Sequence, residues 1–284
     1  MSFRYIISTT PSQIETTFGI HVQSVQPENN YNISAGQYAP VITNDKPFEI
    51  QLFKFGLTPF WAKYEMNLFN ARAEGDCNKC DDPKYHGAMG IIQKKAFRKP
   101  IRSQRCLVIA SAFILGPTDT GLSKPYLFYL QKHKNPFALA GIWDTWLNPA
   151  TLERENTFAI ITTTANSLIQ KIGQKRMPVI LSDSQARKWI KSGTELSCIT
   201  KMLIKYDSNL MNAYPISPII QDPAKNDKAL IRPIGGKLLA EETNEIIRFP
   251  RTSGYHQSKR AQKSNEPTST IAERLEANST KTIY

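Results

Sequence analysis

The residues of this chain best suited to chemistry are cationic side chains that lie within apolar segments or short motifs. They are Arg4, Arg72, Lys95, Arg105 and Arg176. The aromatic pair Phe60 and Trp61 lies among them, in the string Gly56-Leu57-Thr58-Pro59-Phe60-Trp61. Cations that follow phosphates, combined with aromatic faces that stack on unpaired bases at roughly 1–3 kcal/mol per base, are typical of single-strand binding. The alternative interpretation is that both rings are buried in the core and the arginines are solvated.

Other arrangements that could do chemistry give weaker signals. Cys77 and Cys80, followed by His86, supply half of a tetrahedral zinc site. A second pair at that spacing is absent from the sequence, so we expect two loop thiols and no metal. Ser111 lacks the glycine pattern of a nucleophile elbow, and the sequence has no glycine-rich loop that could hold phosphates. Kinase, ATPase and serine-hydrolase functions are therefore disfavoured, and we expect no cofactor.

The charge of the chain favours an anionic partner. Its 284 residues include 36 Lys and Arg against 24 Asp and Glu, for a net charge of +12. Such a balance suits nucleic acid first and a membrane surface second. A soluble basic protein with no anionic ligand is the alternative that charge alone leaves open.

Several classes of protein are excluded by what the sequence lacks. No run of about 18 apolar residues occurs, so we expect no membrane span. The amino terminus has no basic segment followed by an apolar one, as a secretory signal would. Four cysteines do not make a disulfide scaffold in a chain of this size. We therefore expect a cytoplasmic protein, associated with the nucleoid when bound to DNA.

The pattern of predicted elements indicates an α+β fold. Residues 3–8 are typical of a strand, and the alternation of Phe48, Ile50 and Leu52 predicts a half-buried one. Further strands are predicted at 126–130, 137–142 and 157–163, and helices at 11–18, 165–172, 183–190 and 194–206. Ser182 and Gln185 form a capping box for the third helix. Because there is no regular βαβ repeat, we expect a mainly antiparallel sheet curled toward a barrel.

The composition changes after about residue 243. Residues 244–284 are rich in Ser, Thr and Asn and carry 7 basic and 4 acidic residues, so most of the positive charge lies upstream. We predict a single domain over residues 1–243 and a polar, disordered tail over residues 244–284.

Five short strings, in this order, resemble one protein family. They are Tyr31-Asn32-Ile33-Ser34-Ala35-Gly36-Gln37, Gly56-Leu57-Thr58-Pro59-Phe60-Trp61, Asn70-Ala71-Arg72-Ala73-Glu74, Arg105-Cys106-Leu107-Val108 and Arg176-Met177-Pro178-Val179-Ile180-Leu181. Together they are similar to the SRAP domain, over roughly residues 2–235. The resemblance implies a barrel-like fold that binds single-stranded DNA and crosslinks to abasic sites. It also implies an autopeptidase activity that removes Met1.

The resemblance assigns roles to individual residues. Asn70 falls on the family's site asparagine, which would hydrogen-bond the opened sugar. Phosphate contacts are implied for Arg72, Lys95 and Arg176, and Arg4 lies close to the reactive terminus. Phe60 and Trp61 resemble the wedge that separates bases beside the lesion, and Asn32 and Thr162 complete the expected DNA-binding set. In the loop 32–36, Ala35 replaces the usual proline.

The catalytic positions of the family hold other residues here. Ser2 stands in place of the cysteine whose amine and thiol would close a thiazolidine ring on the aldehyde. Leu115 occupies the glutamate position, and Gln174 occupies the histidine position, or Gly173 if the alignment shifts by one. Leucine cannot transfer protons, and glutamine does not titrate near neutrality.

Ser2 retains half of the chemistry that the resemblance implies. Removal of Met1 would expose an α-amine with a pKa of about 7.7–8.0, which can form an imine with an aldehyde. We therefore predict a monomeric, single-stranded-DNA-binding protein that makes a transient imine at abasic sites and no durable crosslink. A noncatalytic binding module for single strands or single–double junctions is the alternative, and an interaction scaffold with a vestigial groove is a third.

Overall fold

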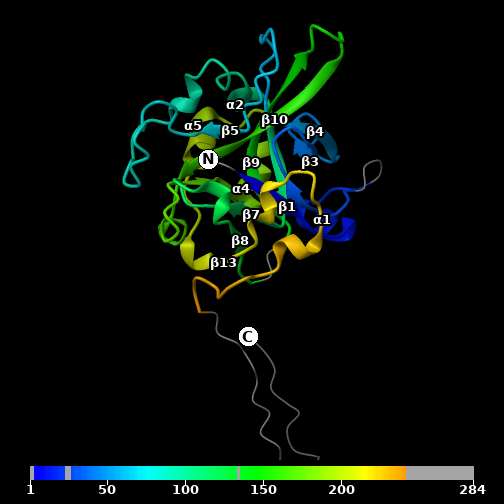
Figure 1. The fold of residues 1–284 in the computed structure, drawn as a ribbon. Coiled ribbons are helices and arrows are strands. Elements are labelled where there is room, and N and C mark those ends of the chain that lie inside the picture. Colours follow the sequence, from blue (N-terminus) through cyan, green and yellow to red (C-terminus); the bar gives the residue numbers. More distant parts are fainter. Residues whose placement is uncertain (1–2, 23–26, 133–134, 241–284) are drawn as a thin grey trace, which may run out of the picture. The chain divides into compact units, whose positions relative to one another are not determined.

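The computed structural model describes residues 3–22, 27–132 and 135–240, which form two sheets with short helices beside them (Figure 1). The smaller sheet has the strand order β13–β8–β7–β1–β2. Its strands are Met211–Pro215, Tyr126–Leu130, Ala112–Leu115, Arg4–Ile7 and Asn30–Ile33, in that order. All four pairings in this sheet are antiparallel.

The larger sheet closes on itself. Its strand order is β11–β10–β4–β3–β6–β9–β12, and β9 also pairs with β10, so the five strands from β10 to β9 form a ring. These strands are β3 (Tyr38–Thr43), β4 (Gln51–Phe55), β6 (Arg105–Ala110), β9 (Phe137–Leu147), β10 (Arg154–Thr164), β11 (Arg176–Pro178) and β12 (Ile180–Leu181). Only the pairings of β10 with β4 and with β5 (Asn70–Arg72) are parallel among the described strands. The predicted α+β fold with a mainly antiparallel, barrel-like sheet is confirmed.

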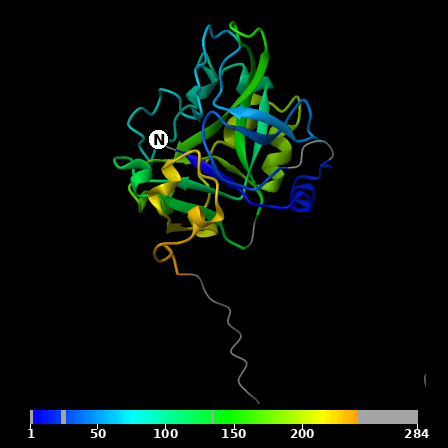
Figure 2. The ribbon, with the colours of Figure 1, turned by 45° about the vertical axis from the view of Figure 1, so that its right-hand side comes forward.

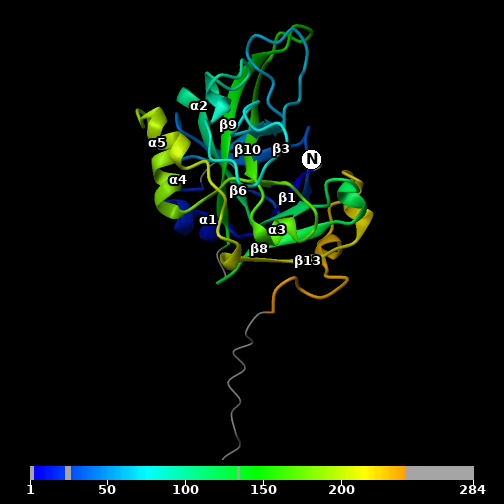
Figure 3. The same cartoon turned by 90° about the vertical axis from the view of Figure 1, so that its left-hand side faces the viewer.

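The helices are short. They are α1 (Pro11–Phe18), α2 (Pro100–Ser103), α3 (Ser167–Gln170), α4 (Asp183–Ile190) and α5 (Leu196–Lys201), with 3₁₀ turns at Gly90–Ile92 (η1), Gly121–Ser123 (η2), Ser208–Leu210 (η3), Pro218–Gln221 (η4) and Lys228–Ile231 (η5). Capping boxes open α1 at Thr10 and α4 at Ser182, because each cap side chain accepts a hydrogen bond from the third helical backbone NH. Figure 3 shows α4 and α5 on one side of the larger sheet and the start of β1 on the other.

A core of aromatic rings joins the two sheets. Phe113 of β7 stacks on Phe128 of β8 with 5.3 Å between ring centroids, and Phe55 of β4 stacks on Phe158 of β10 at 5.1 Å. Phe3 contacts both groups, edge-on to Phe55 at 6.4 Å and stacked on Phe113 at 6.3 Å. The amino end of β1 is therefore fixed against the barrel.

The β9–β10 hairpin extends beyond the body of the fold, beside the loop between β4 and β5 (Figure 2). Hydrogen bonds join this hairpin to the loop, among them those from Trp146 Nε1 to the Ala62 carbonyl and from the Phe60 backbone NH to Asp144. The loop is thus held by the hairpin at its aromatic tip.

Some sequence expectations need correction. The strand predicted around Phe48 begins only at Gln51, where Phe53 and Phe55 are buried, whereas Phe48 and Leu52 are 70% and 49% exposed. The helices predicted over 165–172 and 194–206 are confined to α3 and α5. The predicted domain boundary at residue 243 and the tail lie outside the described residues. No helix in the described part of the chain is long and apolar enough to cross a membrane.

Candidate nucleic-acid interface

Three adjacent strands bring together residues that are far apart in the sequence. Asn70 and Arg72 share one face of β5, because side chains two positions apart point the same way and Ala71 is buried on the other face. β5 runs parallel to β10 with Arg72 opposite Thr162. On the other edge of β10, Thr164 pairs with Arg176 at the start of β11. Strand register therefore places the two arginines on opposite edges of β10, Arg72 beside Thr162 and Arg176 beside Thr164.

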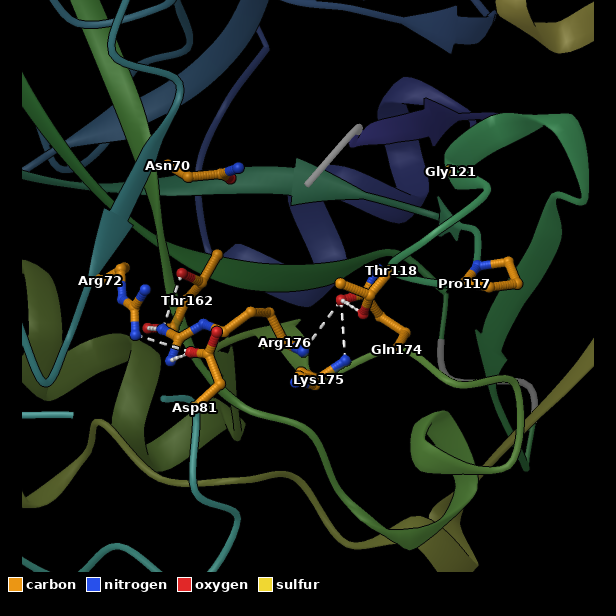
Figure 4. A pocket seen from close by; sticks show the side chains of 10 residues that line it. All are labelled: Asn70, Arg72, Asp81, Pro117, Thr118, Gly121, Thr162, Gln174, Lys175 and Arg176. Carbon is orange, nitrogen blue, oxygen red and sulfur yellow. Dashed lines mark hydrogen bonds and ion pairs between the residues drawn. The ribbon is translucent and has the colours of Figure 1, made fainter. Parts of the chain in front are cut away.

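These side chains line a cavity of about 330 Å³ (Figure 4). Its lining residues are Asn70, Arg72, Asp81, Pro117, Thr118, Gly121, Thr162, Gln174, Lys175 and Arg176. Five of the sequence-predicted site residues meet here: Asn70, Arg72, Thr162, Gln174 and Arg176. We call this space the site cavity.

Two further hollows adjoin the site cavity. One, of about 580 Å³, shares Gly121 with it and reaches Phe3 and Arg4. The other, of about 390 Å³, shares Asn70 and Arg72 with it and reaches Trp61 and Lys95. Because they share lining residues, the three hollows lie next to one another between the start of β1 and the aromatic loop, and together we call them the groove.

Arg176 is tied to its surroundings by four hydrogen bonds or ion pairs. Its Nη1 atom lies 2.9 Å from Glu74 Oε2 and 3.1 Å from Asp81 Oδ1. Its Nη2 atom donates to the carbonyl and to the hydroxyl of Thr162, at 2.7 and 3.1 Å. Glu74 is 2% exposed and also accepts from the Thr163 hydroxyl and from the Thr164 backbone NH. Glu74 is thus a structural partner of Arg176 and does not line the cavity.

The site cavity is not lined by cations alone. Asp81 Oδ1 lies 2.7 Å from Arg72 Nη2 and bridges this guanidinium to that of Arg176. Asp81 belongs to the segment between β5 and η1, which also carries Cys77 and Cys80. One carboxylate therefore occupies the space between the two arginines.

Asn70 has an unused acceptor. Its Oδ1 atom is buried and has no hydrogen-bond partner among the described residues. Figure 4 shows its side chain projecting from β5 over the site cavity. An unpaired buried acceptor costs free energy unless a ligand satisfies it, so this amide is suited to accept from a hydroxyl.

The loop with Phe60 and Trp61 presents aromatic rings beside lysines. Phe60 is 53% exposed, which excludes the core interpretation for this ring. Lys99 Nζ lies 4.3 Å from the centroid of Phe60, and Lys95 Nζ lies 4.3 Å from that of Trp61. Each pair combines a stacking surface with a positive charge, as single-strand binding requires.

The two residues expected at the family's glutamate and histidine positions are structural. Leu115 is fully buried in the core between the sheets and does not line the site cavity. Gln174 is 4% exposed, and its Nε2 atom donates to the Gly116 carbonyl at 2.7 Å. Its Oε1 atom accepts from the backbone NH groups of Lys175 and Arg176. Neither residue can move a proton, and Gln174 fixes the loop that carries Arg176.

Arg4 and Asn32 lie farther from the site cavity. Arg4 lines the hollow near β1, where burial lowers the pKa of its guanidinium and Nη2 reaches the Gln221 carbonyl at 3.5 Å. Asn32 is 1% exposed, and its Nδ2 atom donates to the carbonyls of Asp222 and Lys225. These contacts hold the segment after η4. They use the Asn32 amide within the protein, so they do not support its predicted contact with DNA, which stays a prediction.

Arg105 does not belong to the groove. It is 1% exposed, and its guanidinium donates to the carbonyls of Ile101, Arg102, Trp189 and Lys191. These carbonyls lie at the ends of α2 and α4, where helices leave acceptors unpaired. The arginine of the Arg105-Cys106-Leu107-Val108 string therefore has a structural role, and its expected contact with phosphates is not supported.

Ser2 lies outside the described residues, so its expected role stays a prediction. Its neighbour Phe3 lines the hollow that shares Gly121 with the site cavity.

Lys175 and Asp81 line the site cavity but were not singled out from the sequence. Lys175 is exposed and adjacent to Gln174, so its place in the arginine-methionine-proline region could have drawn attention. Nothing in the sequence around Asp81 indicated that it would lie at the site.

No group of three His, Cys, Asp or Glu side chains that could hold a metal ion occurs in residues 3–22, 27–132 and 135–240. Cys77 and Cys80 are exposed thiols.

Comparison with known sequences identifies similar proteins. The family model described as SOS response associated peptidase (SRAP) matches residues 1–223. The abasic site processing protein YoqW of Bacillus subtilis (strain 168) is 31% identical over 207 residues, covering 71% of this chain and 85% of the relative. The abasic site processing protein YoaM of the same strain is 30% identical over 207 residues, covering 71% and 84%.

Solved structures share the fold. A crystal structure of a protein from Bacteroides thetaiotaomicron has a TM-score of 0.66 at 28% identity, covering 81% of this chain and 98% of that one. A second, from Bordetella bronchiseptica, has a TM-score of 0.61 at 20% identity, covering 76% and 100%. The second likeness concerns the fold alone.

Proposed function

Because this chain belongs to the SOS response associated peptidase (SRAP) family, we propose that it processes abasic sites in single-stranded DNA through the α-amine of Ser2. Relatives named abasic site processing proteins support this assignment. The observation that carries the proposal is the groove, whose neighbouring hollows include Phe3, the free acceptor of Asn70 and Trp61 of the aromatic loop.

The groove favours a single strand over a duplex. Phe60 and Trp61 offer faces on which unpaired bases can stack, and Lys95 and Lys99 lie beside them for the phosphates. Stacking contributes roughly 1–3 kcal/mol per base and does not depend on base identity. Arg72 and Arg176 would bind the backbone where it passes the site cavity.

The proposed reaction is imine formation. The amine nitrogen of Ser2 attacks the aldehyde carbon of the opened abasic sugar, and the carbonyl oxygen leaves as water. Asn70 Oδ1 would accept a hydrogen bond from a sugar hydroxyl and hold the aldehyde in place. Slow loss of a sugar proton and of the 3′ phosphate by β-elimination could then cleave the strand.

We propose that this imine is transient. The serine hydroxyl is a poor nucleophile compared with a thiolate, so it does not close a stable ring on the imine carbon. Leu115 and Gln174 supply no acid or base. Leu115 is buried in the core, and both the Nε2 and the Oε1 atom of Gln174 form hydrogen bonds with the backbone. Proton transfer is left to water, and the imine hydrolyses.

A noncatalytic single-strand-binding module is the second candidate. The loss of acid–base groups at Leu115 and Gln174 favours it, since the groove could bind DNA without any chemistry.

Under either function we propose that the protein is a cytoplasmic monomer that binds DNA.

Borohydride trapping distinguishes the two candidates. The protein is incubated with an abasic single strand and with an intact strand of the same sequence, and borohydride reduces any imine to a stable amine. Intact mass shows whether Met1 has been removed. We expect a trapped adduct on the abasic strand only, and no adduct at any pH would contradict the covalent function.

A matched variant locates the reacting amine. Ser2→Leu, whose bulky side chain opposes removal of Met1, should lose the adduct and keep its affinity for the intact strand. An adduct that persists in Ser2→Leu and disappears in Ser2→Leu with Lys175→Ala would instead assign the imine to the second amine at the site cavity.

The interaction-scaffold interpretation is tested by Arg72→Glu. Replacing attraction with repulsion at a phosphate should weaken binding of single-stranded DNA and reduce its salt dependence. Unchanged DNA binding in this variant would favour the scaffold.

A further inference from the structure

We propose that Asp81 sets the affinity of the groove, because its carboxylate occupies the place of a DNA phosphate between Arg72 and Arg176. When a strand binds, a phosphate exchanges with this carboxylate and the Asp81 segment releases the two arginines. The inference rests on the proposed DNA-binding function and names a residue that the resemblance does not.

The geometry at Asp81 is that of a bound anion. A single oxygen, Oδ1, accepts from Arg72 Nη2 at 2.7 Å and from Arg176 Nη1 at 3.1 Å. The two guanidinium groups come from strands on opposite edges of β10, so they converge on this point only in the folded protein. Figure 4 shows the carboxylate between them at the wall of the site cavity.

The segment around Asp81 is built to deliver this carboxylate. Asp81 has φ of 56°, a left-handed conformation that aspartate tolerates better than most residues. The buried Asn78 holds the turn, since its Oδ1 atom accepts from the Asp82 backbone NH at 2.9 Å and its Nδ2 atom donates to the Asp82 carbonyl at 3.1 Å. Arg72 also donates to the Asn78 carbonyl.

The two carboxylates at Arg176 are not equivalent. Glu74 is 2% exposed and is held by Thr163 and Thr164 as well as by the arginine. The side chain of Asp81 is 19% exposed, and the only groups found to donate to its carboxylate within the described ranges are the two guanidiniums. Glu74 is therefore a permanent partner, whereas Asp81 can leave for solvent.

The arginines retain donors that Asp81 does not use. Nε of Arg72 and Nε of Arg176 are both buried and lack an acceptor in the described part of the chain. A buried donor without an acceptor is costly. A phosphate offers more acceptor oxygens than the one carboxylate oxygen now shared, and guanidinium groups bind phosphate through two parallel hydrogen bonds. Exchange of carboxylate for phosphate therefore improves the pairing of both arginines.

A tethered carboxylate is an intramolecular competitor. A short tether holds it at an effective concentration in the millimolar range or above, so it lowers the affinity for DNA without touching the DNA. Because the carboxylate already neutralises the arginines, phosphate binding releases fewer counterions there. Removing the charge should therefore tighten binding and steepen its salt dependence by about 0.7 for each additional phosphate that the arginines neutralise.

The test is fluorescence anisotropy of a labelled, intact oligothymidylate over a series of NaCl concentrations. Asp81→Asn keeps the size of the side chain and tolerates the left-handed conformation, and we expect about tenfold tighter binding at low salt and a steeper salt slope. Asp81→Gly, which also suits φ of 56°, should behave alike if the asparagine variant folds poorly. The control is Asp82→Asn, which removes the same charge from an exposed neighbour whose carboxylate accepts from the Lys84 backbone NH and forms no ion pair with either arginine in the described residues.

The outcomes separate the two proposals. Tighter binding in Asp81→Asn but not in Asp82→Asn supports the inference. Equal affinities in wild type and Asp81→Asn, or equal increases in both variants, overturn it and leave DNA binding intact. If neither wild type nor any variant binds the oligonucleotide, the proposed function fails and the role of Asp81 fails with it.

Discussion

Glu74 and Arg176, separated by 102 positions in the sequence, form an ion pair that is buried beneath the site cavity, with 2.9 Å between Oε2 and Nη1. The pair joins the end of the Asn70-Ala71-Arg72-Ala73-Glu74 string to the start of the Arg176-Met177-Pro178-Val179-Ile180-Leu181 string. It therefore stabilises the arrangement of β5, β10 and β11 on which the site cavity depends.

Loss of the Glu74 carboxylate should destabilise the fold. Glu74→Ala leaves the Arg176 guanidinium buried with one partner fewer, and removing one member of such a pair costs about 3–5 kcal/mol. Urea unfolding followed by circular dichroism measures the change. Asp119→Ala removes an exposed carboxylate and should stay within about 0.5 kcal/mol of wild type. A similarly small effect for Glu74→Ala would show that the pair does not stabilise the fold.

Phe60 should contribute to binding of unpaired bases. Phe60→Ala removes an exposed ring and should weaken binding of an intact single strand by roughly 1–3 kcal/mol in an anisotropy titration. Tyr64 lies in the same loop and is 73% exposed, but unlike Phe60 it has no lysine over its ring among the described residues, so Tyr64→Ala should bind as wild type does. Equal losses in both variants would argue against a specific stacking role.

A cysteine at position 2 should restore a durable crosslink. In Ser2→Cys the thiolate can attack the imine carbon, forming a C–S bond while a proton passes to the nitrogen. We expect an adduct with an abasic strand that survives denaturing electrophoresis without borohydride. Ser2→Ala, which keeps the amine alone, should give an adduct only after reduction. If Ser2→Cys with Met1 removed forms none, the chain start does not reach the lesion.

Arg105 should matter for folding and not for DNA. Arg105→Ala leaves several carbonyls without a donor, at about 1 kcal/mol for each hydrogen bond lost, so we expect a loss of about 3 kcal/mol in unfolding free energy. The exposed Arg98 offers a matched control, since Arg98→Ala should unfold as wild type does. Weaker DNA binding by correctly folded Arg105→Ala would contradict the structural role.

Thiol reactivity should divide the four cysteines into two classes. Burial raises the pKa of the Cys106 thiol well above its usual value, with a further contribution from Asp45. Because the thiolate is the reactive form, Cys106 stays protonated and unreactive at pH 8 while the exposed Cys77, Cys80 and Cys198 are modified. Mass spectrometry after alkylation should find three labels on the native protein and four on the unfolded one. Four labels on the native protein would contradict the packing around β6.

The sequence predicted local structure best where the signal is itself local. The capping box of Ser182 and Gln185 predicted the start of α4, and the apolar residues of β8 predicted that strand. The strand predicted from alternation around Phe48 was wrong, because a period of two does not show which residues other strands will bury. The barrel buried Phe53 and Phe55 and left Phe48 exposed.

Sequence identified the strands of the site better than the state of their side chains. Arg72 and Arg105 both lie in family-like strings, yet one faces the groove and the other donates to helix ends. Residue type cannot separate these environments, since both are set by contacts across the fold. The carboxylate of Asp81 was missed for the same reason, because its contact with Arg176 spans 95 positions.

Strand β10 fixes the distance between the aromatic loop and the site cavity. Thr157 of β10 accepts from the backbone NH of Thr58 at the base of the aromatic loop, and Thr162 of the same strand lines the site cavity. A strand rises about 3.3 Å per residue, so these two anchors lie about 17 Å apart. Because Arg72 lies opposite Thr162, the strand fixes the number of nucleotides between a base that Phe60 is proposed to displace and a phosphate that Arg72 is proposed to bind. This distance would not depend on the DNA sequence or on the length of the loop.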